Sequence, residues 1–172
     1  MKERLNALQV ALNNEIREHE FYLKNAQRTK NPVGKAMFTQ IAGEELEHHE
    51  RLKQLHEKLE KEKKWPETVP LKVKDTVVKA LLKEAAKNAP KTFNSDADDL
   101  KAIQTAIEFE AKGAENYAKI RDEVVDPKEK AFFNLLANIE HEHFVSLKDT
   151  EEYLTDPGSW FRKMENTDLD GA

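Results

Sequence analysis

Cysteine is absent from this chain of 172 residues, and its absence excludes several kinds of site. Without thiols the protein forms no disulfide, holds no thiolate-ligated zinc ion or iron–sulfur cluster, and has no thiol nucleophile. Serines are few, and none is paired with a base on a recognisable nucleophile elbow, so nothing supports acyl-enzyme chemistry. Any metal ion must therefore be bound by carboxylates and imidazoles.

Glycine is scarce, and long apolar runs are absent. Five glycines in 172 residues, heavy use of Ala, Leu, Glu and Lys, and no sustained period-two alternation favour helix over strand. No apolar run approaches the length of a membrane span, and Met1 to Val10 is charged and amphipathic rather than a signal peptide. We therefore expect an all-α protein that is cytoplasmic and has no membrane partner.

Neither sign of charge dominates the chain. It has 33 acidic and 28 basic residues and a net charge of -5, and the two kinds are interspersed. Short basic clusters such as Lys61 to Lys64 lie among glutamates and lack interleaved aromatic residues, so we expect no nucleic-acid partner. The length suits one domain with its own core, and we assign residues 1–172 to it.

Apolar residues recur at helical spacing in four long stretches, and polar residues interrupt each apolar stripe near its middle. Asn31-Pro32 and Asp126-Pro127 each offer an N-cap and a first-turn proline for a following helix, which predicts short connections between antiparallel neighbours. The interrupting sets are Glu15 with Tyr22, Glu45 with His48, Glu110 with Tyr117, and Glu140 with His143.

The two halves of the chain repeat each other. Residues 5–55 laid on residues 100–150, at a constant offset of 95, are identical at 18 of 51 positions. A period this long, used twice, indicates a duplicated helical hairpin and hence a four-helix bundle. The predicted parts are hairpins at 5–60 and 100–155, a crossover at 61–99 with a short helix at 76–87, and a C-terminal tail at 156–172. We expect the tail's Trp160 and Phe161 to pack onto the bundle or onto a partner.

Four glutamates on core-facing stripes at similar depth require a compensating cation, because desolvating an unpaired carboxylate costs several kcal/mol. No Lys or Arg lies on these stripes at that level. Residues three apart on a helix share a face, so each Glu-x-x-His pair can point at one ion. The donor set suits two first-row metals, iron or manganese, with zinc as an alternative. The predicted ligands are Glu15, Glu45, His48, Glu110, Glu140 and His143.

Other polar residues near these positions receive different interpretations. Tyr22 and Tyr117 each lie two turns beyond a predicted glutamate ligand on the same helix face. They either donate hydrogen bonds to ligating carboxylates as a second shell or pack in the core with satisfied hydroxyls. His19, whose repeat position holds Ala114, is interpreted as a core histidine. Glu44 lies next to a ligand but projects elsewhere, so we assign it to the surface.

These residues together resemble the ferritin-like diiron-carboxylate superfamily, and within it the rubrerythrin-like proteins, from Leu5 to Leu154. The resemblance implies a ferritin-like bundle with two iron ions that reacts with hydrogen peroxide or dioxygen. We also expect a homodimer. The implied roles are Glu15 and Glu110 as terminal carboxylates, Glu45 and Glu140 as bridging carboxylates, and His48 and His143 as imidazole ligands.

Two departures from that family matter. Full-length rubrerythrins carry a cysteine-ligated rubredoxin domain that this sequence lacks, so the resemblance implies a separate electron donor such as a rubredoxin. Rubrerythrins also place an additional glutamate one turn beyond the third-helix ligand, where this chain has Gly113. Glu18 occupies the repeat-equivalent position on the first helix and is a candidate extra ligand.

The leading functional hypothesis is an oxidoreductase that reduces hydrogen peroxide or dioxygen in oxidative-stress defence. Three alternatives remain open at this stage. The protein can be a ferroxidase or iron-handling protein, which needs a shell-like oligomer to store mineral, or a structural bundle with a vestigial metal site. Hydroxylation of an organic substrate is also open to this fold, because function depends on the site rather than on the fold.

Overall fold

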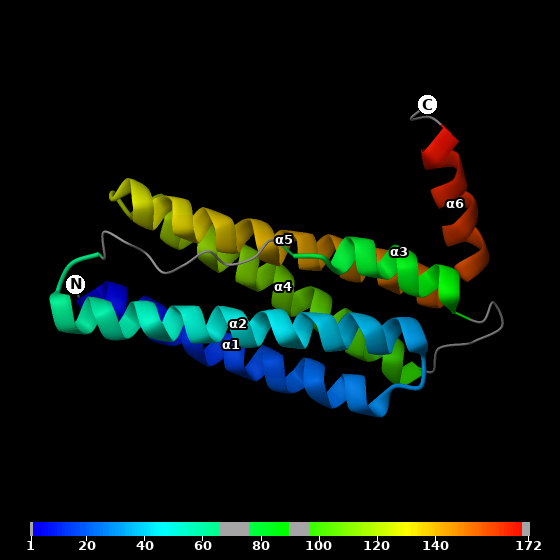
Figure 1. The fold of residues 1–172 in the computed structure, drawn as a ribbon, viewed down its shortest axis with the longest axis horizontal. Coiled ribbons are helices and arrows are strands. Elements are labelled where there is room, and N and C mark those ends of the chain that lie inside the picture. Colours follow the sequence, from blue (N-terminus) through cyan, green and yellow to red (C-terminus); the bar gives the residue numbers. More distant parts are fainter. Residues whose placement is uncertain (1, 66–75, 90–96, 170–172) are drawn as a thin grey trace.

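The computed structural model describes residues 2–65, 76–89 and 97–169, which form six α-helices and no strand. Four long helices make the bundle, with a short helix beside it and another at the C-terminal end (Figure 1). The all-α, ferritin-like prediction is confirmed. The helices are α1 (Lys2–Arg28), α2 (Pro32–Glu62), α3 (Val78–Asn88), α4 (Ala97–Glu123), α5 (Pro127–Thr155) and α6 (Pro157–Leu169).

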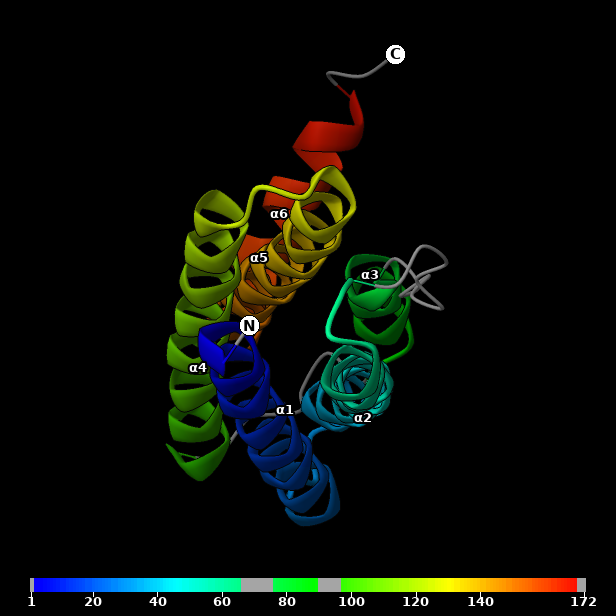
Figure 2. The same ribbon diagram turned by 90° about the vertical axis from the view of Figure 1, so that its left-hand side faces the viewer.

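Two antiparallel hairpins build the bundle: α1 packs along α2, and α4 packs along α5 (Figures 1 and 2). The predicted N-caps are confirmed at both turns. The side chain of Asn31 accepts hydrogen bonds from the backbone N–H groups of Val33 and Gly34, at 2.9 and 3.0 Å. Asp126 does the same at the start of α5. Each cap satisfies donors that a helix start leaves free, so the turns fix where the next helix begins.

Helix α3 is the short helix expected in the crossover, and it lies against α2 and α5 (Figure 2). Residues 66–75 and 90–96 of the predicted crossover lie outside the described residues. Just before the first of these gaps, the buried ring of Trp65 packs 6.0 Å from the ring of Phe132 and 6.1 Å from that of Phe133. This contact attaches the end of α2 to α5.

The segment that we assigned as a tail contains a helix, α6. The Asp156 side chain accepts a hydrogen bond from the backbone N–H of Ser159, at 2.9 Å, in the first turn. Trp160 is only 4% exposed, and its ring meets that of Tyr153 edge to face at 5.5 Å. Trp160 therefore packs back onto the bundle, one of the two arrangements expected from the sequence.

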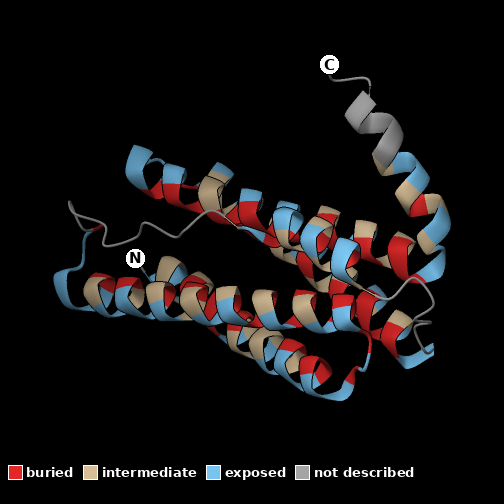
Figure 3. Cartoon of the chain, turned by 45° about the vertical axis from the view of Figure 1, so that its right-hand side comes forward, coloured by how far each residue is buried: buried red, intermediate tan, exposed pale blue. Residues whose placement is uncertain are grey.

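Buried residues line the inner faces of the long helices (Figure 3), and the apolar ones fall into two clusters. Along α1, Leu12 belongs to one cluster and Tyr22 to the other, with the buried Glu15 between them. Ile41 and Leu52 flank the polar positions of α2 in the same way. A polar layer thus crosses the core at mid-height. Within the described part of the chain, no helix combines the length and apolar character needed to cross a membrane.

Candidate metal centre

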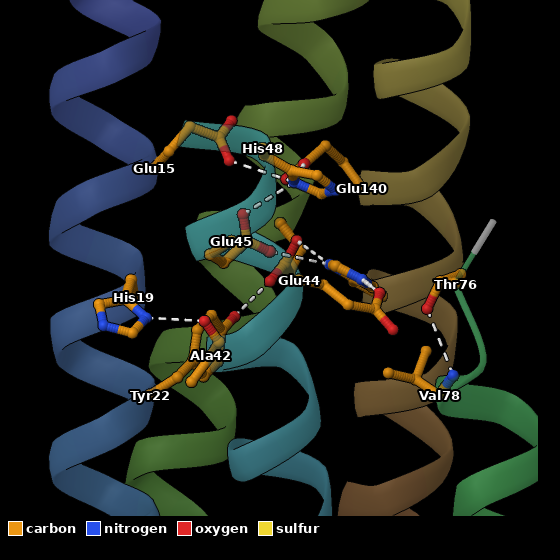
Figure 4. A network of polar contacts seen from close by, with 12 residues as sticks. Glu15, His19, Tyr22, Ala42, Glu44, Glu45, His48, Thr76, Val78 and Glu140 are labelled. Carbon is orange, nitrogen blue, oxygen red and sulfur yellow. Dashed lines mark hydrogen bonds and ion pairs between the residues drawn. The ribbon is translucent and has the colours of Figure 1, made fainter. Parts of the chain in front are cut away.

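All six predicted ligands lie in this polar layer, and each is at most 1% exposed. They come from the four long helices, at the points where each apolar stripe is interrupted. The side chains of Glu15, Glu45, His48 and Glu140 converge between the helices (Figure 4). The six are distributed as Glu15 on α1, Glu45 and His48 on α2, Glu110 on α4, and Glu140 and His143 on α5.

The six side chains form two overlapping groups of four. In each group, the possible ligand atoms lie within 4.8 Å of one another. Glu45 and Glu140 belong to both groups, whereas the other four residues belong to one group each. The groups are Glu15, Glu45, His48 and Glu140, and Glu45, Glu110, Glu140 and His143. This arrangement suits two neighbouring ions that share two carboxylates.

Both imidazoles turn the same nitrogen toward the carboxylates. Nδ1 of His48 lies 3.2 Å from Oε2 of Glu15 and 3.1 Å from Oε2 of Glu45. Nδ1 of His143 lies 3.1 Å from Oε1 of Glu45 and 3.3 Å from Oε2 of Glu110. Each oxygen of Glu45 therefore contacts a different histidine, so this carboxylate bridges the two groups.

Burial and charge together shift the pKa values of the cluster. Burial, with the charge of Glu45, raises the pKa of Glu15 to about 8 and that of Glu140 well above its usual range. Burial alone would lower the pKa of His48, but the charge of Glu45 and a hydrogen bond to Glu15 outweigh it and raise that pKa to about 10. Without metal, the cluster retains protons that balance its negative charge.

The residues present fit a pair of divalent cations. Both carboxylate oxygens of Glu140 are buried and accept no hydrogen bond from the described residues. A buried carboxylate in this state is costly unless a cation or a donor meets it. Two divalent ions would meet these oxygens and balance the four carboxylates, and a mixture of carboxylate and neutral imidazole is a donor set that first-row metals accept.

Two tyrosines connect the hairpins at this level. The hydroxyl of Tyr22 donates a hydrogen bond to Oε1 of Glu110, and that of Tyr117 donates one to Oε1 of Glu15. Burial and the charge of the partner carboxylate raise the pKa of each phenol well above its usual range. Each hydroxyl therefore keeps its proton and orients a carboxylate of the opposite hairpin, while direct ligation by these glutamates remains a prediction.

Glu18, the candidate extra ligand, lies outside both groups of four. It lines a groove between α1 and α4, with a volume of about 410 Å³. The eight residues around this groove form four pairs at the repeat offset of 95: Asn14 with Phe109, Arg17 with Lys112, Glu18 with Gly113, and Phe21 with Asn116. Burial and the charges of Glu45 and Glu110 raise the pKa of Glu18 to about 10, so its carboxyl group is protonated at neutral pH when no metal is bound.

Gly113 lies opposite Glu18 in this groove and lets Glu140 approach α4 closely. A Cβ atom built on Gly113 would lie only 2.6 Å from Oε2 of Glu140. Any larger residue there would require the carboxylate of Glu140 to move. Glu140 thus occupies the space beside position 113.

The sequence interpretation of Glu44 as a surface residue is wrong. Its side chain is 14% exposed, and its Oε2 lies 2.6 Å from Nε2 of His143. A stripe drawn through Ile41, Glu44 and His48 also has spacings of three and four, so a broader helix face would have included Glu44. His19, in contrast, hydrogen-bonds through Nδ1 to the backbone oxygen of Ala42 at 2.7 Å (Figure 4) and belongs to neither group.

Comparisons with known proteins add one finding to this geometry. A model of the family described as Rubrerythrin matches residues 6–151. The matched part contains all six predicted ligands and both tyrosines. Searches among curated proteins and among solved structures gave no match.

Proposed function

Because the chain belongs to the rubrerythrin family, we propose that its buried cluster of carboxylates and histidines binds two iron ions and reduces hydrogen peroxide or dioxygen. One observation carries the proposal: Glu45 and Glu140 are shared by two overlapping groups of possible ligands. Shared carboxylates hold two metal ions close together, and a pair of ions can deliver two electrons to one oxidant molecule.

In this proposal Glu15 and His48 would hold one ion, Glu110 and His143 would hold the other, and Glu45 and Glu140 would be ligands of both. When bound, the pair of iron ions supplies two electrons by passing from the ferrous to the ferric state. Reduction of one hydrogen peroxide molecule to two water molecules consumes these two electrons and two protons. The chain's own residues must therefore position the oxidant, limit the access of water and provide protons.

The surroundings of the cluster suit these tasks. The apolar clusters above and below the polar layer limit water around the ligands. A second groove between α1 and α4, next to the one described above, has a volume of about 250 Å³ and is lined by Glu15, Glu18 and Tyr117. It gives a small oxidant a route to the cluster. The carboxyl group of Glu18 stands in its wall, where it can pass a proton to the product.

The remaining parts of the proposal concern partners. With no cysteine the chain cannot bind a rubredoxin-type iron, so we propose that a separate protein such as a rubredoxin returns electrons to the oxidised centre. We also propose that the protein works as a homodimer in the cytoplasm, in defence against oxidative stress. Light scattering tests the assembly, and a shell-like oligomer would instead favour iron storage.

Anaerobic loading with ferrous iron followed by rapid mixing with hydrogen peroxide tests the reaction. We expect two iron ions per chain and oxidation of both by one equivalent of peroxide. Glu140→Ala removes a shared carboxylate and should lower both the iron content and the oxidation rate. Glu142→Gln, at an exposed position of α5, is the matched control and should change neither. A fully loaded ferrous protein that reacts with neither peroxide nor dioxygen contradicts the proposal.

A further inference from the structure

The acidic residue beside Nε2 of His143 has no acidic counterpart at the equivalent position of the repeat. Nε2 of His143, the nitrogen on the far side from the shared carboxylates, lies 2.6 Å from Oε2 of Glu44. Position 44 corresponds to position 139 at the repeat offset of 95, and that position holds Ile139, which is 3% exposed. Both halves of the chain therefore contribute a histidine to the cluster, but only position 44, and not position 139, holds a carboxylate.

The carboxylate of Glu44 is itself held in place from two directions. The side-chain amide of Gln40 donates to its Oε1 at 2.7 Å, and the backbone N–H of Val77 donates to the same oxygen at 3.4 Å. Thr76 adds a side-chain hydrogen bond to this glutamate. One oxygen is thus fixed by α2 and by the segment that leads into α3, so the other stays directed at His143.

A carboxylate that accepts the Nε2–H of a histidine fixes the tautomer in which Nδ1 carries a free lone pair. It also orients the ring and makes Nδ1 a stronger donor to a metal ion. Partners of this kind typically change metal affinity by about 10–100-fold. In this chain Nδ1 of His143 faces the oxygens of Glu45 and Glu110, which is where a bound ion would need it.

We propose that Glu44 is a positioning residue that makes the two metal positions unequal. The position formed with Glu110 and His143 then binds a divalent ion about 10–100-fold more tightly than the position formed with Glu15 and His48. This inference rests on the proposed binding of two metal ions at the cluster. It does not depend on the redox reaction.

Titration of the metal-free protein with Co²⁺, followed by visible absorption, tests the inequality. We expect the wild-type protein to bind two ions in separate steps. Glu44→Ile copies the residue at position 139, and it should weaken the tighter step about 10–100-fold so that the steps merge. Glu44→Gln keeps an oxygen acceptor without the charge and should give an intermediate loss.

Two controls separate positioning from general stability. Gln40→Leu removes a hydrogen bond to the far oxygen of Glu44 but leaves its contact with His143, so it should weaken the first step less than Glu44→Ile does. Glu142→Gln should change neither step. A second readout is the paramagnetically shifted NMR signal of the His143 Nε2–H in the Co²⁺-loaded protein. It should exchange with solvent faster in Glu44→Ile, and circular dichroism shows whether that variant keeps its helices.

Each outcome has a clear meaning. Separate steps that merge in Glu44→Ile support the inference. Two ions bound with equal affinity by the wild-type protein, or a tight step that Glu44→Ile and Glu44→Gln both leave unchanged, overturn it while the metal centre stands. Failure of the wild-type protein to bind Co²⁺ overturns the proposed metal centre, and this inference with it.

Discussion

The hydroxyl of Tyr117 on α4 donates a hydrogen bond to Oε1 of Glu15 on α1, 102 positions earlier in the chain. Tyr22 makes the reciprocal bond to Glu110 across 88 positions. Both bonds are buried, and both join one hairpin to the other at the level of the acidic cluster. The same two hydrogen bonds therefore hold the hairpins together and orient Glu15 and Glu110 in the cluster.

Removing one of these hydroxyls should loosen the link between the hairpins. Tyr117→Phe leaves the buried carboxyl group of Glu15 without this donor, so we expect the free energy of unfolding to fall by about 1–3 kcal/mol, the usual cost of leaving a buried polar group without its partner. Urea unfolding of the metal-free protein measures it. Tyr153→Phe, in the aromatic contact with Trp160, is the control and should cost less. Equal losses in the two variants would contradict a special role for the Tyr117 bond.

A methyl group at position 113 should disturb the centre. Gly113→Ala places a Cβ 2.6 Å from Oε2 of Glu140. Because this atom is the far end of a flexible side chain, we expect a smaller loss of stability than the about 1–3 kcal/mol that overpacking of a core typically costs. Because Glu140 must move, Co²⁺ binding should weaken as well. Gly43→Ala, where no atom lies within 4 Å of the added Cβ, should instead stabilise its helix by about 0.5–1 kcal/mol. Thermal unfolding and metal titration of both variants measure the contrast, and Gly113→Ala with unchanged metal binding would count against the close contact.

The stability of the metal-free protein should fall as the pH rises. The folded-state pKa of Glu15 is raised from 4.5 to about 8, and that of His48 from 6.5 to about 10. Groups with raised pKa values bind protons more tightly in the folded state, so their stabilisation is complete below the unfolded-state values and is lost as the pH passes through the folded-state ones. We expect the urea midpoint to decrease between about pH 5 and pH 8, and to decrease less in Glu15→Gln. A midpoint that rises over this range would contradict the assignment.

Helix α6 should contribute to the stability of the whole bundle. Trp160 is 4% exposed and packs against Tyr153 and Phe161. Trp160→Ala should therefore lower the free energy of unfolding by about 3–5 kcal/mol, the usual cost of removing a buried tryptophan. Phe161→Ala, at a half-buried position, should cost less. Chemical unfolding measures both, and a loss below about 1 kcal/mol for Trp160→Ala would mean that α6 is only loosely attached.

Much of the fold follows from local signals in the sequence. Asn31 and Asp126 act as N-caps because their side chains reach backbone donors only two or three residues away, so a few neighbouring residues determine where α2 and α5 begin. The placement of Glu45 and His48 in the interior follows from their register with Ile41 and Leu52 on one helix face. Such features depend on helical geometry alone, which sequence spacing captures.

Other features depend on contacts between distant segments or on signals with two meanings. The role of Glu44 depends on His143 in another helix, and the need for glycine at position 113 depends on the side chain of Glu140. The assignment of residues 156–172 to a tail missed α6, because the proline at position 157 also suits the first turn of a new helix. Spacing within one stretch cannot distinguish these cases.

The contact between Gly113 and Glu140 also restricts the order in which this sequence can change. The Cβ of any side chain at position 113 would lie 2.6 Å from Oε2 of Glu140. If position 113 changes first, the carboxylate of Glu140 must therefore move. If Glu140 is replaced first, the chain passes through a form that lacks one of the two shared carboxylates. In either order the intermediate has Glu140 displaced or missing, so we expect natural variation at these two positions to be linked.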